Sequence, residues 1–169
     1  MTGTALDVDG LLAALDGEGE GSVRNAGGYW ITRVDLDVRT MATVMGEREV
    51  RLITLTARPD PEGGYRLIYH WDTGDTVLNI ATTVPTGAQA PTIADLIPGA
   101  DWAEREIRDY YDLDFTGRSG TPTLMLRPGD PAGMFARTSE VGRDAAPAST
   151  ARMLAESGQA GARQEGEPK

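Results

Sequence analysis

Hydrophobic residues recur at two spacings along the chain, and each spacing predicts one kind of element. Apolar positions within 6–15 lie close to helical spacing and predict a short amphipathic helix. A second helix is expected over 38–45, with Asp37 as its N-cap and Gly46 as its end. The apolar residues that share one face of this second helix are Val38, Met41, Ala42 and Met45.

Segments rich in branched and aromatic residues predict four strands, at 29–34, 50–57, 65–71 and 76–84. Within the third, apolar residues at 67, 69 and 71 alternate with the residues between them, as expected for a strand with two different faces. Short turns separate the last three segments and predict an antiparallel meander. The fold class is therefore α+β: a mixed, mostly antiparallel four-stranded sheet with helices on one face.

Glycine and proline punctuate the chain after Thr116, where no hydrophobic period is sustained. We therefore expect a core domain at 1–115 followed by an extended, partner-binding arm at 116–140. Residues 141–169 are rich in Ala, Gly, Ser, Arg and Glu, with almost no large apolar side chains. Such a composition cannot offset the entropy lost on ordering, so this tail is predicted to be disordered.

The segment 101–112 predicts the last helix of the core domain, at about 102–111. Asp101 is placed to act as its N-cap and Glu104 to complete a capping box. Spacing of four residues predicts ion pairs from Glu104 to Arg108 and from Arg105 to Asp109. The pattern indicates a salt-bridged amphipathic helix packed on the sheet. An acid–base role is disfavoured, because paired arginines lower carboxylate pKa values.

Composition narrows the chemistry. The 169 residues contain 26 acidic and 16 basic side chains, a net charge of -10, which disfavours nucleic acid as a partner. Cysteine is absent, so the chain cannot hold thiolate-ligated iron–sulfur clusters, and His70 is the one histidine. No apolar run approaches the ~20 residues that span a bilayer, and the start lacks the pattern of a signal peptide. We expect a soluble, cytoplasmic protein.

The segment from Ala100 to Tyr111, followed by Leu113, Phe115 and Gly117, resembles the signature of the 30 kDa subunit family of respiratory complex I (NADH dehydrogenase). That signature has Ala-x-Trp-x-Glu-Arg-Glu-x-x-Asp and then two bulky apolar residues. The order of elements upstream agrees, so the resemblance extends over about 29–127. The positions that carry the motif, or that we assign to partner docking, are Trp102, Glu104, Arg105, Glu106, Asp109, Tyr110, Tyr111, Phe115 and Gly117.

The resemblance implies a structural subunit of the peripheral cytoplasmic arm of a complex I-like, membrane-bound oxidoreductase, with no cofactor and no active site of its own. Its partners would be the large catalytic or quinone-site subunit, which it docks and orients, and a small iron–sulfur subunit. Iron–sulfur clusters, and in hydrogenase relatives a nickel–iron centre, would lie in those partners. The membrane would be reached only through partner subunits, on its cytoplasmic side.

Three positions depart from the family pattern. Asp112 stands where glycine is usual, Arg118 replaces a histidine, and Pro122 falls near an expected arginine. These departures favour a relative of the nickel–iron hydrogenase type over an ordinary NADH:quinone oxidoreductase. Two other classes stay open: a stand-alone enzyme with a pocket built around Glu104, Glu106, Asp109 and His70, and an adaptor outside any redox complex.

Overall fold

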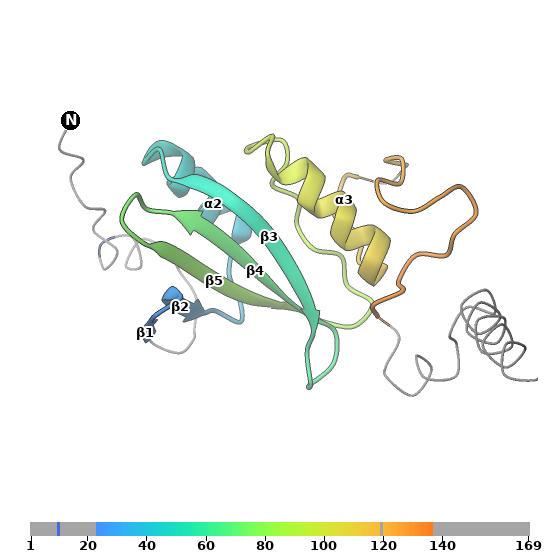
Figure 1. Cartoon of the computed structure of the whole chain (residues 1–169), viewed down its shortest axis with the longest axis horizontal. Helices are drawn as coiled ribbons and strands as arrows, with labels where there is room; N and C mark the ends of the chain where they lie inside the picture. The colour runs from blue at the N-terminus through green and yellow to red at the C-terminus, as the bar shows by residue number, and fades with distance from the viewer. Residues whose placement is uncertain (1–9, 11–22, 119, 137–169) are drawn as a thin grey trace, which may run out of the picture. The chain divides into compact units, whose positions relative to one another are not determined.

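The computed structural model describes residue 10, residues 23–118 and residues 120–136 (Figure 1). The predicted helix at 6–15, the end of the predicted arm and the tail at 141–169 lie outside the described residues, apart from residue 10. The elements are, in chain order, β1 (Val23–Asn25), β2 (Gly28–Thr32), α2 (Val38–Glu47), β3 (Arg51–Pro59), β4 (Tyr65–Asp72), β5 (Val77–Val84) and α3 (Ala100–Tyr111).

The strands form one mixed sheet in the order β1-β2-β5-β4-β3. β3, β4 and β5 make the predicted antiparallel meander, β2 joins β5 in parallel, and β1 pairs antiparallel with β2. The α+β class is confirmed, but the sheet has five strands where four were predicted. The additional strand, β1, has three residues, all exposed, so no alternation of buried and exposed positions marks it in the sequence.

Helix α2 begins as predicted and ends later. The Asp37 carboxylate accepts hydrogen bonds from the backbone N–H groups of Arg39 and Thr40, at 3.0 and 3.1 Å. Gly46 does not end the helix, which continues to Glu47. The left-handed residue after the helix is Glu49, with φ of 57°. The four predicted face residues of α2 are all buried.

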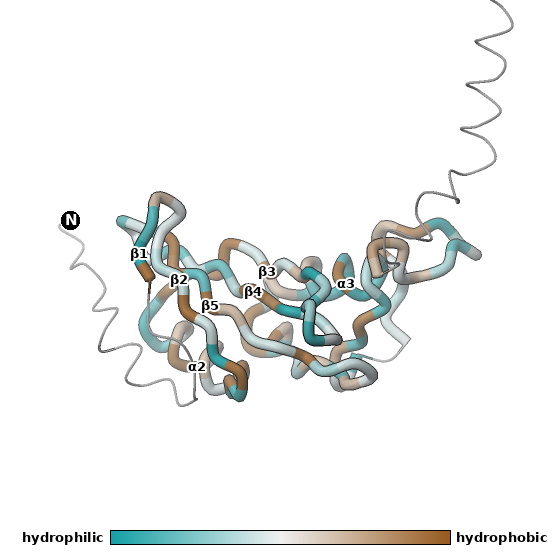
Figure 2. The backbone as a smooth tube through the Cα atoms, turned by 90° about the horizontal axis from the view of Figure 1, so that it is seen from below, coloured by the Kyte–Doolittle hydropathy of each residue, from teal (hydrophilic) through white to brown (hydrophobic). Residues whose placement is uncertain are grey.

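The hydrophobic core lies on one face of the sheet. Leu67, Tyr69 and Trp71 are fully buried on alternate positions of β4, which confirms the predicted pattern. The buried apolar residues of α2 and α3 belong to the same cluster. Figure 2 shows α2 beneath the sheet, and Figure 1 shows α3 alongside β3, the strand at the sheet's edge. Neither α2, with 10 residues, nor α3, with 12, is long enough to cross a bilayer.

The turn between β3 and β4 requires glycine at position 64. Asp60 and Gly64 close it through a hydrogen bond of 3.0 Å from the N–H of Asp60 to the carbonyl of Gly64. Gly64 has φ of +81°, and a Cβ there would lie 2.2 Å from the carbonyl oxygen of Val84. Gly74, in the turn between β4 and β5, has a similar φ of +91° with no atom within 4 Å of such a Cβ.

Substitutions at these two glycines distinguish the cost of backbone strain from the cost of steric overlap. Gly74→Ala adds only the left-handed strain, so we expect it to lower the free energy of unfolding by about 1–2 kcal/mol. Gly64→Ala adds overlap with a sheet carbonyl and should cost roughly 3 kcal/mol or more. Urea unfolding of both variants measures the difference. Equal losses would contradict the close approach of Gly64 to β5.

Candidate functional site

Helix α3, which carries the motif, starts two residues earlier than predicted. The N-cap is Gly99, and no side chain caps the helix. Asp101, predicted as the cap, lies in the first turn, where a negative charge favours the helix dipole. Its carboxylate pairs with the guanidinium of Arg118 and, at 3.5 Å, with that of Arg105. The predicted capping box is therefore wrong, because both of its side chains have other partners.

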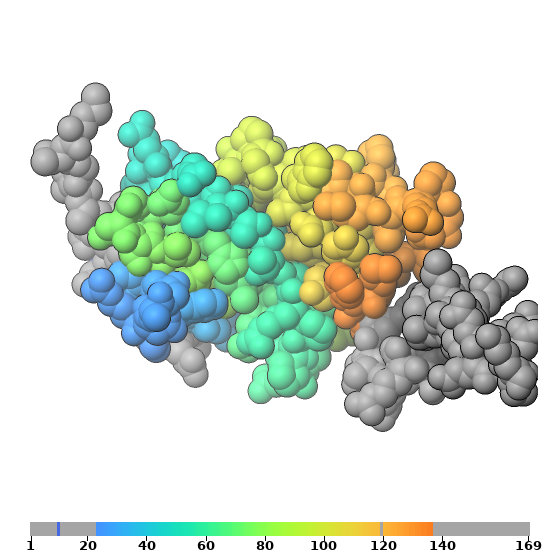
Figure 3. Space-filling model, in the orientation of Figure 1, coloured from blue at the N-terminus to red at the C-terminus, as the bar shows by residue number. Residues whose placement is uncertain are grey.

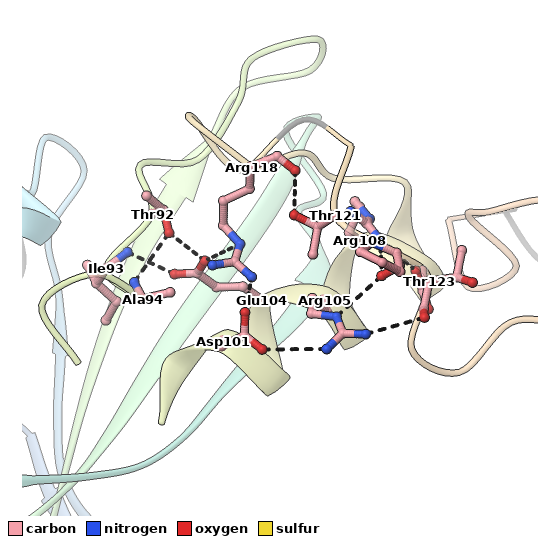
Figure 4. A network of polar contacts seen from close by, with 12 residues as sticks. Thr92, Ile93, Ala94, Asp101, Glu104, Arg105, Arg108, Arg118, Thr121 and Thr123 are labelled. Atoms are coloured by element: carbon pink, nitrogen blue, oxygen red, sulfur yellow. Dashed lines mark hydrogen bonds and ion pairs between the residues drawn. The ribbon is translucent and has the colours of Figure 1, made fainter. Parts of the chain in front are cut away.

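Glu104 is the most deeply buried charged group of the motif, with a side chain that is 0% exposed. One carboxylate oxygen accepts a hydrogen bond of 2.8 Å from the backbone N–H of Ile93. The other accepts one of 2.6 Å from the Thr92 hydroxyl and lies 3.3 Å from Nε of Arg118 (Figure 4). Glu104 thus ties the segment before α3 to the segment after it.

Burial raises the pKa of Glu104 above its ordinary value of 4.5. Three donors act against that rise: the Thr92 hydroxyl, the Ile93 N–H and the Arg118 guanidinium. The loss of hydration outweighs them. The Glu104 side chain is fully buried, so its carboxylate is not open to a substrate in this arrangement.

Arg118 bridges the two acidic residues at the start of α3, as Figure 4 shows. It lies 14 positions after Glu104, so in-helix spacing could not reveal the pair. The predicted pair of Glu104 with Arg108 is therefore wrong. In place of a second i,i+4 pair with Asp109, Arg105 pairs with Asp101 one turn earlier. Two ion pairs of the motif helix have a buried carboxylate, Arg118–Glu104 at 3.3 Å and Arg108–Asp109 at 3.5 Å, whereas Arg105 pairs with the partly exposed Asp101.

Asp109 holds the segment that follows residue 120. One oxygen of its buried carboxylate accepts hydrogen bonds from the N–H groups of Leu124 and Met125, at 2.6 and 2.8 Å. Burial alone would raise the pKa of Asp109, but the backbone donors and Arg108 outweigh it and lower the pKa below its ordinary value. The Asp109 side chain is therefore held ionised by the backbone that it binds.

The arginines of α3 bind the same segment through its carbonyl groups. Arg105 and Arg108 both donate to the carbonyl of Pro122, at 3.3 and 3.0 Å, and Arg105 also donates to that of Thr123. Further along, the N–H of Phe135 donates to the carbonyl of Tyr110 at 2.8 Å. The described part of the predicted arm thus packs along α3, and the space-filling view shows it there in orange (Figure 3).

A second chain of contacts joins the two helices. Arg39 of α2 donates to the carbonyl of Thr92 at 2.7 Å and pairs with Asp95 at 2.8 Å. The hydrogen bond from Arg39 lowers the pKa of Asp95 to about 2. The residues 92–95 are therefore held from one side by α2 and from the other by Glu104.

The predicted hydrophobic anchors divide into buried and exposed groups. Phe115 is 3% exposed, and the backbone beside it pairs with Ala90. Tyr110 and Tyr111 are partly buried, and the ring of Tyr110 lies 4.7 Å from that of Phe135. Trp102 points outward and is 61% exposed. Gly117 adopts a left-handed φ of 74° at the turn that leads to Arg118.

The side chains expected for a stand-alone catalytic pocket have separate surroundings. Glu104 and Asp109 bind backbone, and His70 binds Thr56 at 2.9 Å and Asn79 at 2.6 Å across the sheet. Of the four candidates, only Glu106 lines the cavity beside β3. In the described part of the chain, no group of three or more His, Asp or Glu side chains is placed to hold a metal ion. These contacts hold the segments before and after α3 against that helix.

Sequence reasoning missed two polar residues of this site, Thr92 and Arg118. Arg118 stood out only as a departure from the family pattern, and neither residue was assigned a contact with the motif. Both lie outside α3, 12 and 14 residues from Glu104 along the chain. A buried carboxylate would have required such donors, but the sequence does not show that Glu104 faces inward.

Comparison with known proteins agrees with the motif. A family model described as respiratory-chain NADH dehydrogenase, 30 kDa subunit, matches residues 32–134. The chain is similar to the C/D subunit of NADH-quinone oxidoreductase from Phocaeicola vulgatus, 32% identical over 80 residues, which are 45% of this chain and 15% of that protein. The corresponding protein of Nitrosospira multiformis is 35% identical over 72 residues, 40% of this chain and 12% of that protein.

A shorter relative, the C subunit of NADH-quinone oxidoreductase from Rhodopseudomonas palustris, is 30% identical over 67 residues. These residues make up 38% of this chain and 34% of that protein. In these three relatives the match therefore spans no more than about a third of the relative's own length.

The hydrogen bonds to Asp109 predict the effect of removing its carboxylate. Asp109→Ala leaves the N–H groups of Leu124 and Met125 without their acceptor, at a cost of about 1–3 kcal/mol. Hydrogen exchange at these two amides should become at least about tenfold faster. Asp130→Ala is the control, because Asp130 accepts from the N–H of Arg127 in an exposed turn. Unchanged exchange at 124 and 125 would contradict the proposed anchoring.

The raised pKa of Glu104 predicts a pH dependence with a definite sign. The folded chain keeps a proton on Glu104 to higher pH than the unfolded chain does. The free energy of unfolding should therefore fall as the pH rises from 4.5 through the raised pKa. Glu104→Gln should remove this fall.

Urea unfolding between about pH 4 and pH 8 measures the pH dependence that Glu104 is expected to cause. Glu106→Gln is the control, because it makes the same change on a less buried carboxylate. The lowered pKa values of Asp101 and Asp109 act in the opposite direction, with stability lost as the pH falls below 3.8. The two effects therefore occupy different pH ranges. An identical pH dependence in the Glu104→Gln variant and the wild type would refute the assignment.

Proposed function

The chain belongs to the respiratory-chain NADH dehydrogenase 30 kDa subunit family, and from this membership we propose that it is a cofactor-free structural subunit of a complex I-like, membrane-bound oxidoreductase. In this role it lies in the peripheral arm, on the cytoplasmic side, and reaches the membrane only through partner subunits. It docks and orients the large catalytic or quinone-site subunit, next to a small iron–sulfur subunit.

The observation that carries the proposal is that two carboxylates of the motif point into the protein and bind its own backbone. Glu104 and Asp109 bind loop backbone on either side of α3, which is what a rigid scaffold requires and what an acid–base catalyst does not. Their contacts leave large apolar side chains on the outside. Those on α3 and in the segments that flank it are Leu96, Trp102, Met125, Met134 and Phe135, between 41% and 61% exposed.

Exposed side chains of this size support a protein-binding surface, because aromatic residues and methionine are enriched where subunits meet. Trp102 is the strongest single candidate, since tryptophan is the residue type that most often dominates binding energy at an interface. It is also a motif position, which links the family signature to the outer surface of α3 as well as to its interior.

We assign electron transfer to the partner subunits because of the amino-acid composition of this chain. Without cysteine and with one histidine, it lacks the ligands of iron–sulfur clusters. The clusters, and a nickel–iron centre if the complex is of the hydrogenase type, would lie in the large and small partner subunits. The net charge of -10 favours protein partners over nucleic acid.

Native co-purification tests the proposal. The tagged full chain, expressed in its own host, should recover a large subunit and a small iron–sulfur subunit, with iron present in the partners. Nickel in the recovered complex would assign it to the hydrogenase type, and its absence beside quinone reductase activity to the NADH:quinone type. A recovered partner without metal would favour an adaptor, and turnover by the purified chain alone would overturn the proposal.

Trp102→Ala predicts a loss of binding without a loss of stability. Its exposed ring contributes little to the core, so the melting temperature should change by less than about 2 °C. Binding to the partner should weaken by roughly thirtyfold, as for removal of an interface hot spot worth about 2 kcal/mol. Val34→Ala, which truncates another exposed apolar side chain, is the control. Equal recovery of partner by both variants would place the interface elsewhere.

A further inference from the structure

A cavity of about 410 Å³ lies between the edge strand β3 and helix α3. One wall is formed by residues 54–57 of β3. The other is the side of α3 that carries Glu106, Ile107, Tyr110 and Tyr111, and Phe135 of the following segment also lines it. We call this cavity the β3–α3 groove.

Glu106 is the motif carboxylate that the fold does not use. Glu104 and Asp109 each accept hydrogen bonds from loop backbone, whereas the side chain of Glu106 has no hydrogen bond or ion pair with any described residue. It is partly buried and is the one charged side chain among the described residues that line the groove. A partly desolvated carboxylate without a partner favours a cation.

The walls of the groove indicate which kind of molecule would supply that cation. β3 is last in the strand order, so its outer edge has no strand partner in the described part of the sheet. An edge strand beside a groove favours an extended peptide over a helix or a small molecule. Tyr110 and Phe135 present rings 4.7 Å apart, and Tyr111 lies 5.9 Å from Phe135. Aromatic rings beside a carboxylate suit the planar guanidinium of arginine.

We propose that the β3–α3 groove binds an extended segment of a neighbouring subunit, which inserts an arginine between Glu106 and the rings of Tyr110 and Phe135. This inference rests on the proposed function and adds to it the chemistry of one contact. A chain with a net charge of -10 also favours a basic segment electrostatically.

Peptide binding to the full chain tests the groove without any partner subunit. The probes are the capped tripeptides Val-Arg-Val and Val-Gln-Val, titrated into isotope-labelled protein. The arginine peptide should shift the amide resonances of residues 54–57 and 106–111, and the glutamine peptide should bind about tenfold more weakly. Glu106→Gln should weaken binding of the arginine peptide by about the same factor. Glu47→Gln, the same change at an exposed position of α2, should leave it unchanged.

Four outcomes would overturn the inference. These are shifts located elsewhere, equal binding of the two peptides, or equal binding by wild type and Glu106→Gln. The fourth is a change at residues 137–169 in the Glu106→Gln spectrum without peptide, which would assign the groove to the chain's own C-terminal segment.

Co-purification separates this inference from the proposed function. If the wild-type chain recovers partner subunits, Glu106→Gln should recover fewer of them than Glu47→Gln does, and equal recovery would refute the groove's role. If the wild-type chain recovers no partner subunit, the proposed function fails, and the groove's place at a subunit interface fails with it. A positive peptide result would in that case stand only as a property of the isolated chain.

Discussion

Burial of the Glu104 carboxylate is the constraint on which the motif region depends. A carboxylate that is removed from water must have a partner for each oxygen, or it costs several kcal/mol. The donors come from both sides of the helix in sequence: Thr92 and Ile93 before it, and Arg118 after it. Satisfying one group therefore fixes three segments at once. Arg39 extends the same constraint to α2, because it binds the carbonyl of Thr92.

The three carboxylates of the motif differ in role because the helix points them in different directions. Glu104 and Glu106 are two residues apart and therefore face different sides of α3, one into the core and one into the β3–α3 groove. Asp109 lies five residues after Glu104 and meets the backbone of residues 124 and 125. One sequence block thus supplies two internal anchors and one carboxylate that the proposed arginine contact would use.

The elements governed by local rules could be predicted from the sequence. Asp37 caps α2 through contacts within three residues, and alternation along β4 identifies its buried face. The errors arise where the deciding contact is distant or too small to leave a pattern. β1 is three exposed residues long. Asp101 has the right residue type for a cap, but turns formed by the carbonyls of Ile97 and Pro98 satisfy the N–H groups of Ala100 and Asp101. The helix therefore starts without a side-chain cap.

The candidate site shows the same limit more sharply. Spacing alone gave Glu104 a partner four residues along the helix, which is the correct inference for an exposed face and the wrong one for a buried carboxylate. The family resemblance identified the motif but not the use of each residue within it. This division of roles follows from the position of the sheet. Polar groups on the side of α3 that faces the core must find partners within the chain. On the other side, Trp102 is exposed and Glu106 lines the groove. The proposed partner-binding surface and the rigid interior are thus two faces of one helix, and the contacts of the interior fix the shape of that surface.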